Sequence, residues 1–388
     1  MIAPARSVAF DVVRRVFEND AYADRALASA ARDLDERDRA LAQRIAYGTV
    51  QRVRTIDHGI EQLGRRPVRK LDPPVRAALR IAAYQLAWSD APAHAIADDA
   101  VELVRAAGFE RATAFTNAVV RRLATGFRGF VASLPEGPLK HSYPDWIFEL
   151  WERDWGRDEA LALARAQNEP PALEVFSEVP VGEPTDVPGA YRVERVDRER
   201  MWPMSRASQL AALIVGSREG ERVLDATAAP GGKTRLLRGS VTAVELHEGR
   251  ARELEENVRG RDVRVVVGDV RELDESGFDR ALVDAPCSGL GVLARRPDLR
   301  WRARPLPELQ AELLRAAAER VQPGGVVVYS VCTLNADENE AIVDAAGLEP
   351  EPLGEEWPQY AHPKRPEFLL TTPHRDDTSG FFISRLRV

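Results

Sequence analysis

Cysteine is scarce in this sequence, with two residues in 388, and this excludes a fold held together by disulfides. Because no cluster of histidine and cysteine surrounds them, the two cysteines also argue against a structural zinc site. Long apolar runs are absent, since no window approaches the roughly 18 residues that span a membrane. The first residues also lack the apolar core of a secretion signal. We therefore expect a cytoplasmic protein that binds no metal and no membrane.

Lysine is also scarce, because only four of the 54 basic residues are lysines. The charge is uneven along the chain: residues 1–140 carry 22 basic and 17 acidic side chains (net +5), whereas the remainder carries 32 and 44 (net −12). A basic N-terminal third on an acidic body favours a polyanionic partner that contacts one part of the chain. Apolar residues make up 44% and charged residues 30%, which is typical of globular proteins and excludes extensive disorder.

Three stretches of the sequence differ in pattern. Residues 1–132 have apolar side chains at three- and four-residue spacing, which predicts an all-α domain of five or more helices. Residues 133–203 hold nine of the 26 prolines, so we expect a connector and a shortened subdomain, with one helix over about 145–166. Residues 204–388 alternate short apolar runs with helical stretches, which is typical of an α/β domain with a mostly parallel, doubly wound sheet.

Reactive side chains end the apolar runs of the α/β region. Such sheets bind their ligands beyond the carboxyl ends of the parallel strands. These side chains should therefore gather along one edge of the sheet. They are Asp225, Glu245, Asp269, Asp284 and Cys332.

A glycine-containing turn follows the first of these runs. Asp225 leads into Ala-Thr-Ala-Ala-Pro-Gly-Gly-Lys-Thr, and we expect a helix to begin near Gly232. A phosphate-binding P-loop would need glycine six residues before Lys233, where the sequence has Thr227. Since glycines let a ligand approach the backbone closely, the turn favours a nucleoside-type ligand without phosphates.

Two acids at the next strand ends extend this site. Glu245 lies about 20 residues after Asp225, where an acid can accept hydrogen bonds from both ribose hydroxyls. Asp269 ends the third run and is placed to meet an adenine amino group. Together, the turn and the acids favour a Rossmann-like adenosine site over an ordinary tight turn and a surface glutamate.

Both cysteines lie at predicted strand ends on the same edge. Cys287 stands in Asp284-Ala-Pro-Cys287, and Cys332 stands in Tyr329-Ser-Val-Cys332. A thiolate that adds to C6 of a pyrimidine makes C5 nucleophilic. An acid near N3 assists this addition, and a base must later remove the C5 proton so that the thiolate can leave. One nucleophilic thiol, one helper thiol and one carboxylate match this scheme.

Three segments resemble motifs I, IV and VI of the S-adenosylmethionine-dependent RNA cytosine-C5 methyltransferases, namely residues 225–234, 284–291 and 329–333. Arg295-Arg-Pro-Asp-Leu-Arg-Trp301 resembles the segment after motif IV, and Ser379-Gly-Phe-Phe-Ile383 resembles the C-terminal strand of that family. Four segments of the helical part resemble the NusB-like RNA-binding domain, namely Ala46–Thr49, Leu79–Leu86, Pro92–Ala95 and Thr116–Arg122. The combination resembles the bacterial Sun/Fmu/RsmB-type 16S ribosomal RNA methyltransferases.

The resemblance implies a NusB-like bundle, a Rossmann-like catalytic domain, S-adenosylmethionine as cofactor and RNA as partner. It implies that Cys332 attacks C6 and that Cys287 assists product release. It also implies that Asp284 contacts both the cytosine and the methionine end of the cofactor. The other cofactor-binding residues that it implies are Asp225, Ala228, Ala229, Pro230, Gly231, Gly232, Lys233, Glu245, Arg250 and Asp269.

The sequence departs from the family pattern in four places. Leu173–Phe176 stands in place of an Arg-Val-Asn-like strand, in a subdomain that is shortened, and Met204-Ser-Arg206 replaces Val-Gln-Asp. Ser379 replaces an aspartate, and Thr227 stands where cysteine is frequent. The first two changes fall where the family positions its RNA.

Two alternative functions remain beside methylation of ribosomal RNA by an enzyme that we expect to be a monomer. One is a non-catalytic RNA-binding or ribosome-assembly protein on a relict methyltransferase fold, which the shortened middle segment motivates. The other is the same chemistry on transfer RNA. The intact cysteine pair and motif I favour an active enzyme.

Overall fold

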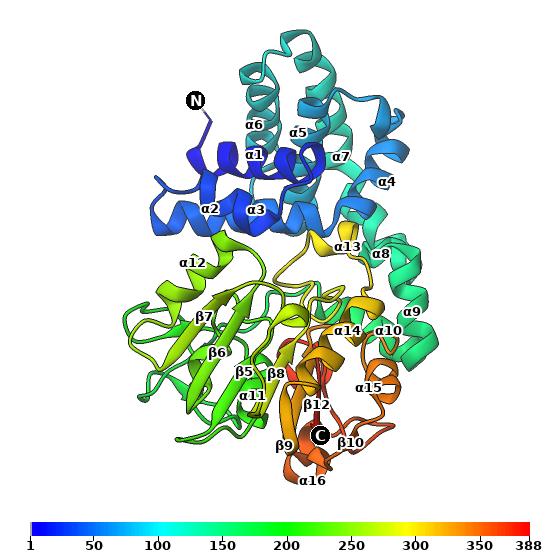
Figure 1. The fold of residues 1–388 in the computed structure, drawn as a ribbon. Coiled ribbons are helices and arrows are strands. Elements are labelled where there is room, and N and C mark those ends of the chain that lie inside the picture. Colours follow the sequence, from blue (N-terminus) through cyan, green and yellow to red (C-terminus); the bar gives the residue numbers. More distant parts are fainter. Residues whose placement is uncertain (1) are drawn as a thin grey trace. The chain divides into compact units, whose positions relative to one another are not determined.

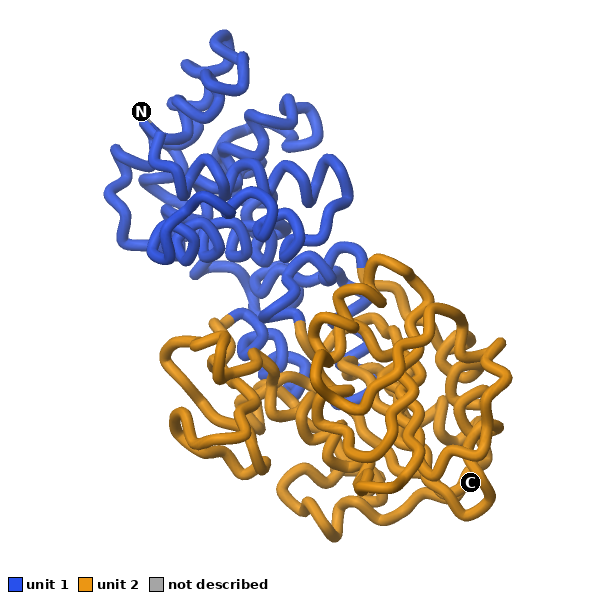
Figure 2. Tube along the Cα trace, turned by 60° about the vertical axis from the view of Figure 1, so that its left-hand side comes forward, with its two compact units in different colours: residues 1–168, 293–302 blue, residues 169–292, 303–388 orange. Residues whose placement is uncertain are grey.

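The computed structural model describes residues 2–388, which divide into two compact units. Unit 1 is built from the chain up to Asn168 together with Leu293–Arg302, and unit 2 from Glu169–Val292 and Ala303–Val388 (Figure 2). This division differs from the predicted boundaries after residues 132 and 203. The stretch 133–168 folds with the helices because Arg54 pairs with Asp145 at 2.8 Å and its backbone N–H donates to Ser142 Oγ at 3.0 Å.

Unit 1 is helical, as the sequence predicts (Figure 1). A large cluster of buried apolar side chains forms the core of α1 to α7, and it includes Val12, Ile56, Leu79 and Phe127, all of which are fully buried. The helices are α1 (Pro4–Glu18), α2 (Ala23–Ala30), α3 (Glu36–Gln51), α4 (Val53–Gly64), η1 (Val68–Lys70), α5 (Pro73–Trp88), α6 (Ala93–Ala106), η2 (Glu110–Ala112), α7 (Thr113–Ser133), α8 (Pro138–His141), α9 (Asp145–Trp155), α10 (Arg157–Ala166) and α13 (Leu299–Arg302).

The helix expected over about 145–166 is two helices. α9 ends and α10 begins at Gly156, whose φ of 87° lies in the left-handed region that other residues adopt at a cost. Of the tryptophans in α9, Trp151 is fully buried and its ring meets Tyr143 edge-on, whereas Trp146 is exposed. The helical prediction for this stretch is therefore confirmed, but Trp146 does not share the buried face of Trp151, and the glycine ends the first helix.

Unit 1 is completed by a segment that lies between the two cysteines in the sequence. In α13, Arg300 is fully buried and its guanidinium lies over the Tyr143 ring at 4.0 Å. Burial lowers the pKa of Arg300 to about 10. Trp301 Nε1 donates to Val50 O at 2.7 Å. The guanidinium donates to oxygens of Gln51 (3.2 Å), Gln167 (2.8 Å), Asn168 (2.8 Å), His141 (3.4 Å) and Ser142 (3.3 Å).

Unit 2 contains a mostly parallel sheet in the order β10-β12-β9-β8-β5-β6-β7, with β11 paired to β12. Starting from β5, the chain adds β6 and β7 toward one edge of the sheet and then β8 and β9 toward the other edge. The strand order therefore reverses between β5 and β8, which is where doubly wound sheets bind ligands. The strands are β5 (Arg222–Asp225), β6 (Ser240–Glu245), β7 (Val263–Val267), β8 (Phe278–Asp284), β9 (Val321–Val331), β10 (Glu349–Pro350), β11 (Leu369–Thr371) and β12 (Phe381–Arg387).

Helices and turns connect these strands, and α11, α12 and α14 pack against the sheet. The helix expected from about Gly232 is only one 3₁₀ turn, η3, because the chain must enter β6 at Ser240 and leaves no room for a longer helix. The elements are α11 (Arg206–Ile214), η3 (Thr234–Leu236), α12 (Glu248–Asn257), η4 (Val270–Glu272), α14 (Pro307–Ala318), α15 (Glu340–Ala346), α16 (Leu353–Glu356), η5 (Pro358–Tyr360) and α17 (Pro373–Asp376).

The proline-rich stretch before α11 forms a small antiparallel sheet of four strands in the order β2-β3-β1-β4. Its strands are β1 (Glu174–Phe176), β2 (Glu183–Pro184), β3 (Ala190–Arg192) and β4 (Trp202–Pro203). The sequence predicted a connector and a shortened subdomain here, and the strands are only two or three residues long. Among the described residues, no helix is both long and apolar enough to cross a membrane.

Replacing Arg300 with alanine should destabilise unit 1. The change leaves several buried carbonyl oxygens without a donor, so we expect the free energy of unfolding to fall by about 3 kcal/mol. Urea unfolding followed by tryptophan fluorescence measures this. Arg304→Ala is the matched control, because Arg304 is exposed. Equal stability of the two variants would contradict the structural role of Arg300.

Candidate functional site

The carboxyl ends of β5, β8 and β9 bring the three motif-like segments together. β8 and β9 pair in parallel with Asp284 opposite Ser330, and Ser330 Oγ donates to Asp284 Oδ1 at 3.0 Å. Lys233 Nζ lies 2.6 Å from Asp284 Oδ2. The side chain of Thr227 donates to the carbonyl of Asp284 at 2.9 Å, which ties the glycine-containing turn to the end of β8.

The two thiols lie beside this ion pair, with Cys287 Sγ 3.5 Å from Cys332 Sγ. The pKa of Cys332 lies below its ordinary value, chiefly because it shares a hydrogen bond with Cys287, and Lys233 adds to this lowering. The same hydrogen bond and burial hold the pKa of Cys287 well above its ordinary value. The site therefore favours one thiolate, on Cys332, and one neutral thiol, on Cys287.

Residues of α12 fix the turn from Ala226 to Lys233 in place. Asn257 Nδ2 donates to Pro230 O at 2.7 Å, and Arg250 Nη2 donates to Ala229 O at 2.8 Å. Gly231 has a φ of 102°, and a Cβ there would come within 2.8 Å of the Leu254 side chain. Glycine is therefore required at this position by both backbone conformation and packing.

Asp225, at the end of β5, is buried beneath the turn. Thr234 Oγ1 donates to its Oδ2 at 2.8 Å, whereas its Oδ1 is buried and has no hydrogen-bond partner among the described residues. Burial raises the pKa of Asp225 to about 7, and the charge of Asp284 contributes to the increase. A buried carboxyl oxygen without a donor fits a ligand that brings an N–H or O–H group.

Glu245 ends β6, and its carboxylate is buried. Its Oε1 accepts from the backbone N–H of His247 at 2.9 Å, and its Oε2 lies 3.6 Å from Arg250 Nη2. Two apolar side chains at neighbouring strand ends, Leu246 and Val267, are 56% and 53% exposed. Exposed apolar groups beside an acid fit the adenine and ribose of a nucleoside, although the sequence did not single out either of them.

Asp269 follows β7 but is engaged by its own neighbour. Arg271 Nη2 pairs with its carboxylate at 2.6 Å, and the backbone N–H of Arg271 donates to it at 2.9 Å. These contacts lower the pKa of Asp269. In this arrangement the carboxylate already has several donors, so Asp269 has less capacity for an adenine amino group than Glu245 has for a ribose.

Two glycines from distant parts of the chain bring their backbones into contact near the cysteines. Gly380 N donates to Gly291 O at 2.8 Å, and a Cβ on Gly291 would lie 2.1 Å from Gly380 O. Gly291 N in turn donates to Cys332 O at 3.0 Å. Phe381, which follows Gly380 in the sequence, has its ring centre 5.0 Å from Lys233 Nζ. The loop of Cys287 is therefore fixed to the C-terminal strand.

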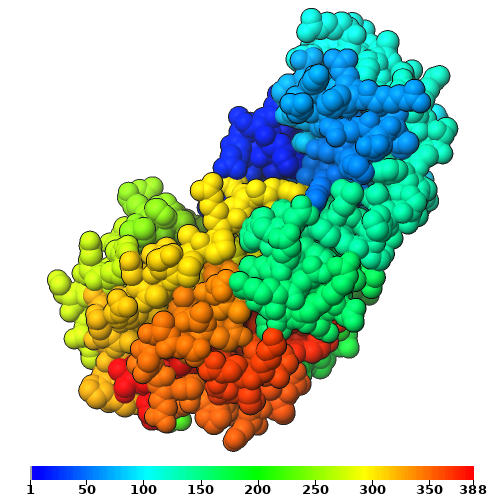
Figure 3. All heavy atoms as spheres, turned by 90° about the vertical axis from the view of Figure 1, so that its right-hand side faces the viewer, coloured from blue at the N-terminus to red at the C-terminus, as the bar shows by residue number. Residues whose placement is uncertain are grey.

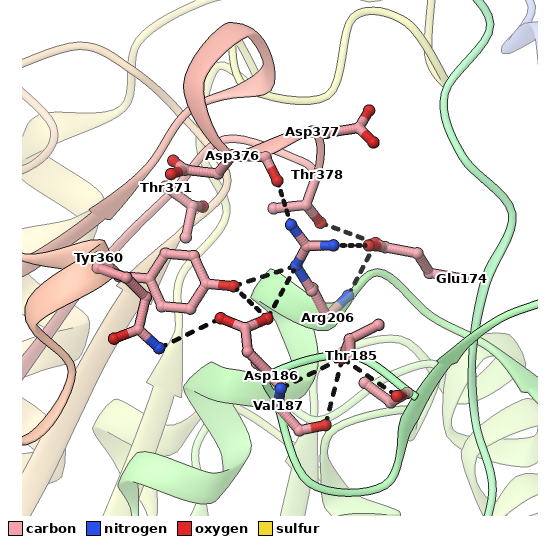
Figure 4. Close-up of polar contacts among 12 residues, drawn as sticks. Glu174, Thr185, Asp186, Val187, Arg206, Tyr360, Thr371, Asp376, Asp377 and Thr378 are labelled. Carbon is pink, nitrogen blue, oxygen red and sulfur yellow. Dashed lines mark hydrogen bonds and ion pairs between the residues drawn. The ribbon is translucent and has the colours of Figure 1, made fainter. Parts of the chain in front are cut away.

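A second polar cluster surrounds Arg206, one of the positions that departs from the family pattern (Figure 4). Arg206 Nη1 pairs with Glu174 Oε1 at 3.1 Å, and Arg206 Nε donates to Tyr360 Oη at 3.1 Å. Tyr360 Oη donates to Asp186 Oδ1 at 2.8 Å, and Thr378 Oγ1 donates to Glu174 Oε2 at 2.7 Å. These contacts join the small sheet to α11 and to the turn before β12, so Arg206 has a structural role.

The described residues contain no group of three or more histidine, cysteine, aspartate or glutamate side chains that could hold a metal ion. The structure thus brings together Asp225, Lys233, Asp284, Cys287 and Cys332, and it places Glu245 and Arg250 at the adjoining strand end. Sequence reasoning missed the two exposed apolar side chains and Asn257. It assigned no role to Glu338, which is buried among the cysteine-bearing loops.

Family models and individual relatives point to the same protein family. The model described as 16S rRNA methyltransferase RsmB/F matches residues 212–387, and the NusB family model matches residues 3–125. A probable ribosomal RNA small subunit methyltransferase B from Synechocystis sp. is 32% identical, with 99% of each chain covered. A ribosomal RNA small subunit methyltransferase B from Thermus thermophilus is 34% identical over 91% of this chain and 89% of its own.

Solved structures share the fold. The crystal structure of the protein PH0851 matches 100% of this chain and 99% of its own, with a TM-score of 0.82 and 22% identity. The structure of NSun6 from Pyrococcus horikoshii with SFG matches 64% of this chain and 98% of its own, with a TM-score of 0.53 and 20% identity. The resemblance noted in the sequence is confirmed: the chain belongs to the RsmB/F family of S-adenosylmethionine-dependent 16S rRNA methyltransferases.

Proposed function

We propose that this protein methylates C5 of a cytosine in 16S ribosomal RNA through a covalent bond between Cys332 and C6. The observation that carries the proposal is the pair of thiols 3.5 Å apart beside the Lys233–Asp284 ion pair. Drift in a non-catalytic protein would not preserve two close thiols and a neighbouring ion pair at a ligand-binding edge. This favours an enzyme over a relict scaffold.

Cys332 is the nucleophile in this proposal. Its thiolate adds to C6, and the electron pair of the C5–C6 double bond moves toward N3, where a hydrogen bond or proton stabilises it. Asp284 and Lys233 are the charged pair at this position: the carboxylate accepts from the cytosine amino group, and the ammonium offers a proton. C5 then becomes able to accept a methyl group.

S-adenosylmethionine supplies the electrophilic methyl carbon when it is bound. Asp225 and the turn that follows β5 would hold its methionine part, and Glu245 would hold its ribose. Leu246 and Val267 would flank its adenine. The set of residues proposed to contact the cofactor is Asp225, Ala228, Ala229, Pro230, Gly231, Gly232, Lys233, Glu245, Arg250, Asp269 and Asp284.

Cys287 assists the release of the product. After methyl transfer, loss of the C5 proton to a base restores the C5–C6 double bond and expels the Cys332 thiolate. Cys287 can exchange a proton with Cys332, because the two sulfurs are within hydrogen-bond distance. A neutral thiol at this position also returns a hydrogen bond to the leaving thiolate.

RNA binding is supported by a basic surface on unit 1. Residues 62–71 contain four basic and no acidic side chains, and residues 111–135 contain four arginines and no acid. The two stretches adjoin, because Arg122 Nη1 donates to Gly64 O at 3.4 Å and the Arg66 guanidinium lies 5.5 Å from the Phe115 ring centre. Part of this surface, coloured medium blue to cyan, is visible in Figure 3. Uncompensated arginines suit contacts with phosphates.

Replacing Cys332 with alanine should abolish methyl transfer and leave cofactor binding intact. We expect the rate to fall by at least about a thousandfold, since the covalent step has no substitute nucleophile. The measurement is transfer of labelled methyl from S-adenosylmethionine to unmodified 16S ribosomal RNA, with the modified cytosine mapped by bisulfite sequencing. Turnover by the variant would refute the mechanism. Methyl transfer to transfer RNA but not to ribosomal RNA would show that transfer RNA is the substrate. If the wild type does not bind the cofactor, this would favour a relict scaffold.

Replacing Cys287 with alanine should trap the enzyme on its RNA. Cys332 can still attack C6 in this variant, but release is impaired, so a covalent protein–RNA complex should survive a denaturing gel. The double variant Cys287→Ala/Cys332→Ala is the control, because it lacks the nucleophile and should give no complex. If the single variant gives no complex either, Cys287 does not have the release role.

Reversing charge on the basic surface should weaken RNA binding. The triple variant Arg65→Glu/Arg66→Glu/Arg69→Glu should bind RNA about tenfold or more weakly. Its salt dependence should lose about one unit of log–log slope for each arginine that contacts a phosphate. Arg37→Glu, an exposed change beside the acids of 33–38, is the control. Filter binding at several salt concentrations measures both, and an unchanged slope would remove this surface from the RNA interface.

A further inference from the structure

We propose that Glu338 is a positioning residue that holds the two cysteine-bearing loops in register and thereby makes Cys332, rather than Cys287, the nucleophile. This inference rests on the proposed function, because it concerns the same two thiols. Glu338 lies in the turn after β9 and its side chain is fully buried. Its backbone carbonyl accepts from Tyr329 Oη at 2.7 Å, which fixes the turn to the strand that carries Cys332.

The residue that follows each cysteine converges on this one carboxylate. Ser288, next to Cys287, donates its backbone N–H to Glu338 Oε1 at 3.0 Å and its hydroxyl to Oε2. Thr333, next to Cys332, has its hydroxyl 3.5 Å from Oε2. The two hydroxyls also lie 2.7 Å apart. Glu338 thus connects the two loops directly, one residue away from each sulfur.

Further donors hold the carboxylate in place. Asn335 Nδ2 donates to Oε2 at 3.1 Å, and the backbone N–H of Leu306 donates to Oε1 at 3.1 Å. Gln310 donates to Oε1 at 3.0 Å and also to Pro286 O at 2.9 Å, so it fixes the residue before Cys287 as well. All these donors are neutral groups. A buried carboxylate with this many donors is costly to replace and rigidly placed.

The charge of Glu338 acts unequally on the two thiols. The hydrogen bond with Cys332 and burial raise the pKa of Cys287, and the Glu338 carboxylate raises it further. For Cys332, the hydrogen bond with Cys287 and the charge of Lys233 lower the pKa. The charged and titratable groups around the pair are therefore Lys233, Asp284, Tyr329 and Glu338. Glu338 disfavours a thiolate on Cys287, and Lys233 favours one on Cys332.

The test is Glu338→Gln, which keeps the size of the side chain and removes its charge. We expect kcat for methyl transfer to fall about tenfold or more while KM for S-adenosylmethionine changes by less than about twofold. Iodoacetamide labelling followed by peptide mass mapping should show that label, confined to Cys332 near neutral pH in the wild type, spreads to Cys287. The pH dependence of labelling at each cysteine should also converge, which a loss of stability alone would not produce.

Asp337→Asn is the matched control, since it removes the same charge one residue away at an exposed position and should behave like the wild type. If Glu338→Gln folds and keeps the wild-type kcat and labelling pattern, the role of Glu338 is overturned. If Glu338→Gln does not fold, Ser288→Ala and Thr333→Val remove single arms of the network. Each should give part of the kcat loss and part of the change in labelling, and wild-type behaviour in both would overturn the proposal.

The same experiments separate this inference from the proposed function. If the wild type transfers no methyl group to any RNA, the proposed function fails, but the labelling pattern of wild type and Glu338→Gln still tests the control of ionisation. If the wild type is active and Cys332 is essential, a normal Glu338→Gln variant overturns the role of Glu338 alone.

Discussion

The parallel register of β8 and β9 is the constraint on which the candidate site depends. It sets Asp284 opposite Ser330, and the two loops that leave these strands carry Cys287 and Cys332. Side chains alternate along a strand, so a slip of one residue would turn Ser330 away from Asp284 and separate the thiols. The buried run at the end of β9 pairs with β8 on one side and β12 on the other, and this fixes the register.

The loops around the site are held by contacts between backbones as much as by side chains. Gly291 and Gly380 approach so closely that neither accepts a side chain without displacement, and α12 holds the carbonyls of Ala229 and Pro230 through Arg250 and Asn257. A site of this kind is preorganised, because its charged groups are placed before any ligand arrives. The buried Asp225 beneath the turn then keeps one carboxyl oxygen, Oδ1, without a hydrogen-bond partner among the described residues.

Much of this arrangement could be predicted from local patterns. Apolar periodicity predicted the helical unit and the parallel sheet, and the position of acids and cysteines at strand ends predicted that they would meet. Features that depend on distant contacts could not be predicted. The helix expected near Gly232 is shortened by the position of β6, and the buried Glu338 reads in the sequence as one acid among several. Its role follows only from the convergence of Ser288 and Thr333 on it.

The membership of Leu293–Arg302 in the helical unit has a consequence for the order in which the protein folds. During synthesis the helices up to Asn168 emerge first, yet Val50, Gln51 and Gln167 offer carbonyls whose donors are Arg300 and Trp301. Domains generally fold as they leave the ribosome, but this one must wait until β5 to β8, half of the strands of the large sheet, have been made. The final packing of the helical unit therefore requires a chain that has been made beyond the loop of Cys287.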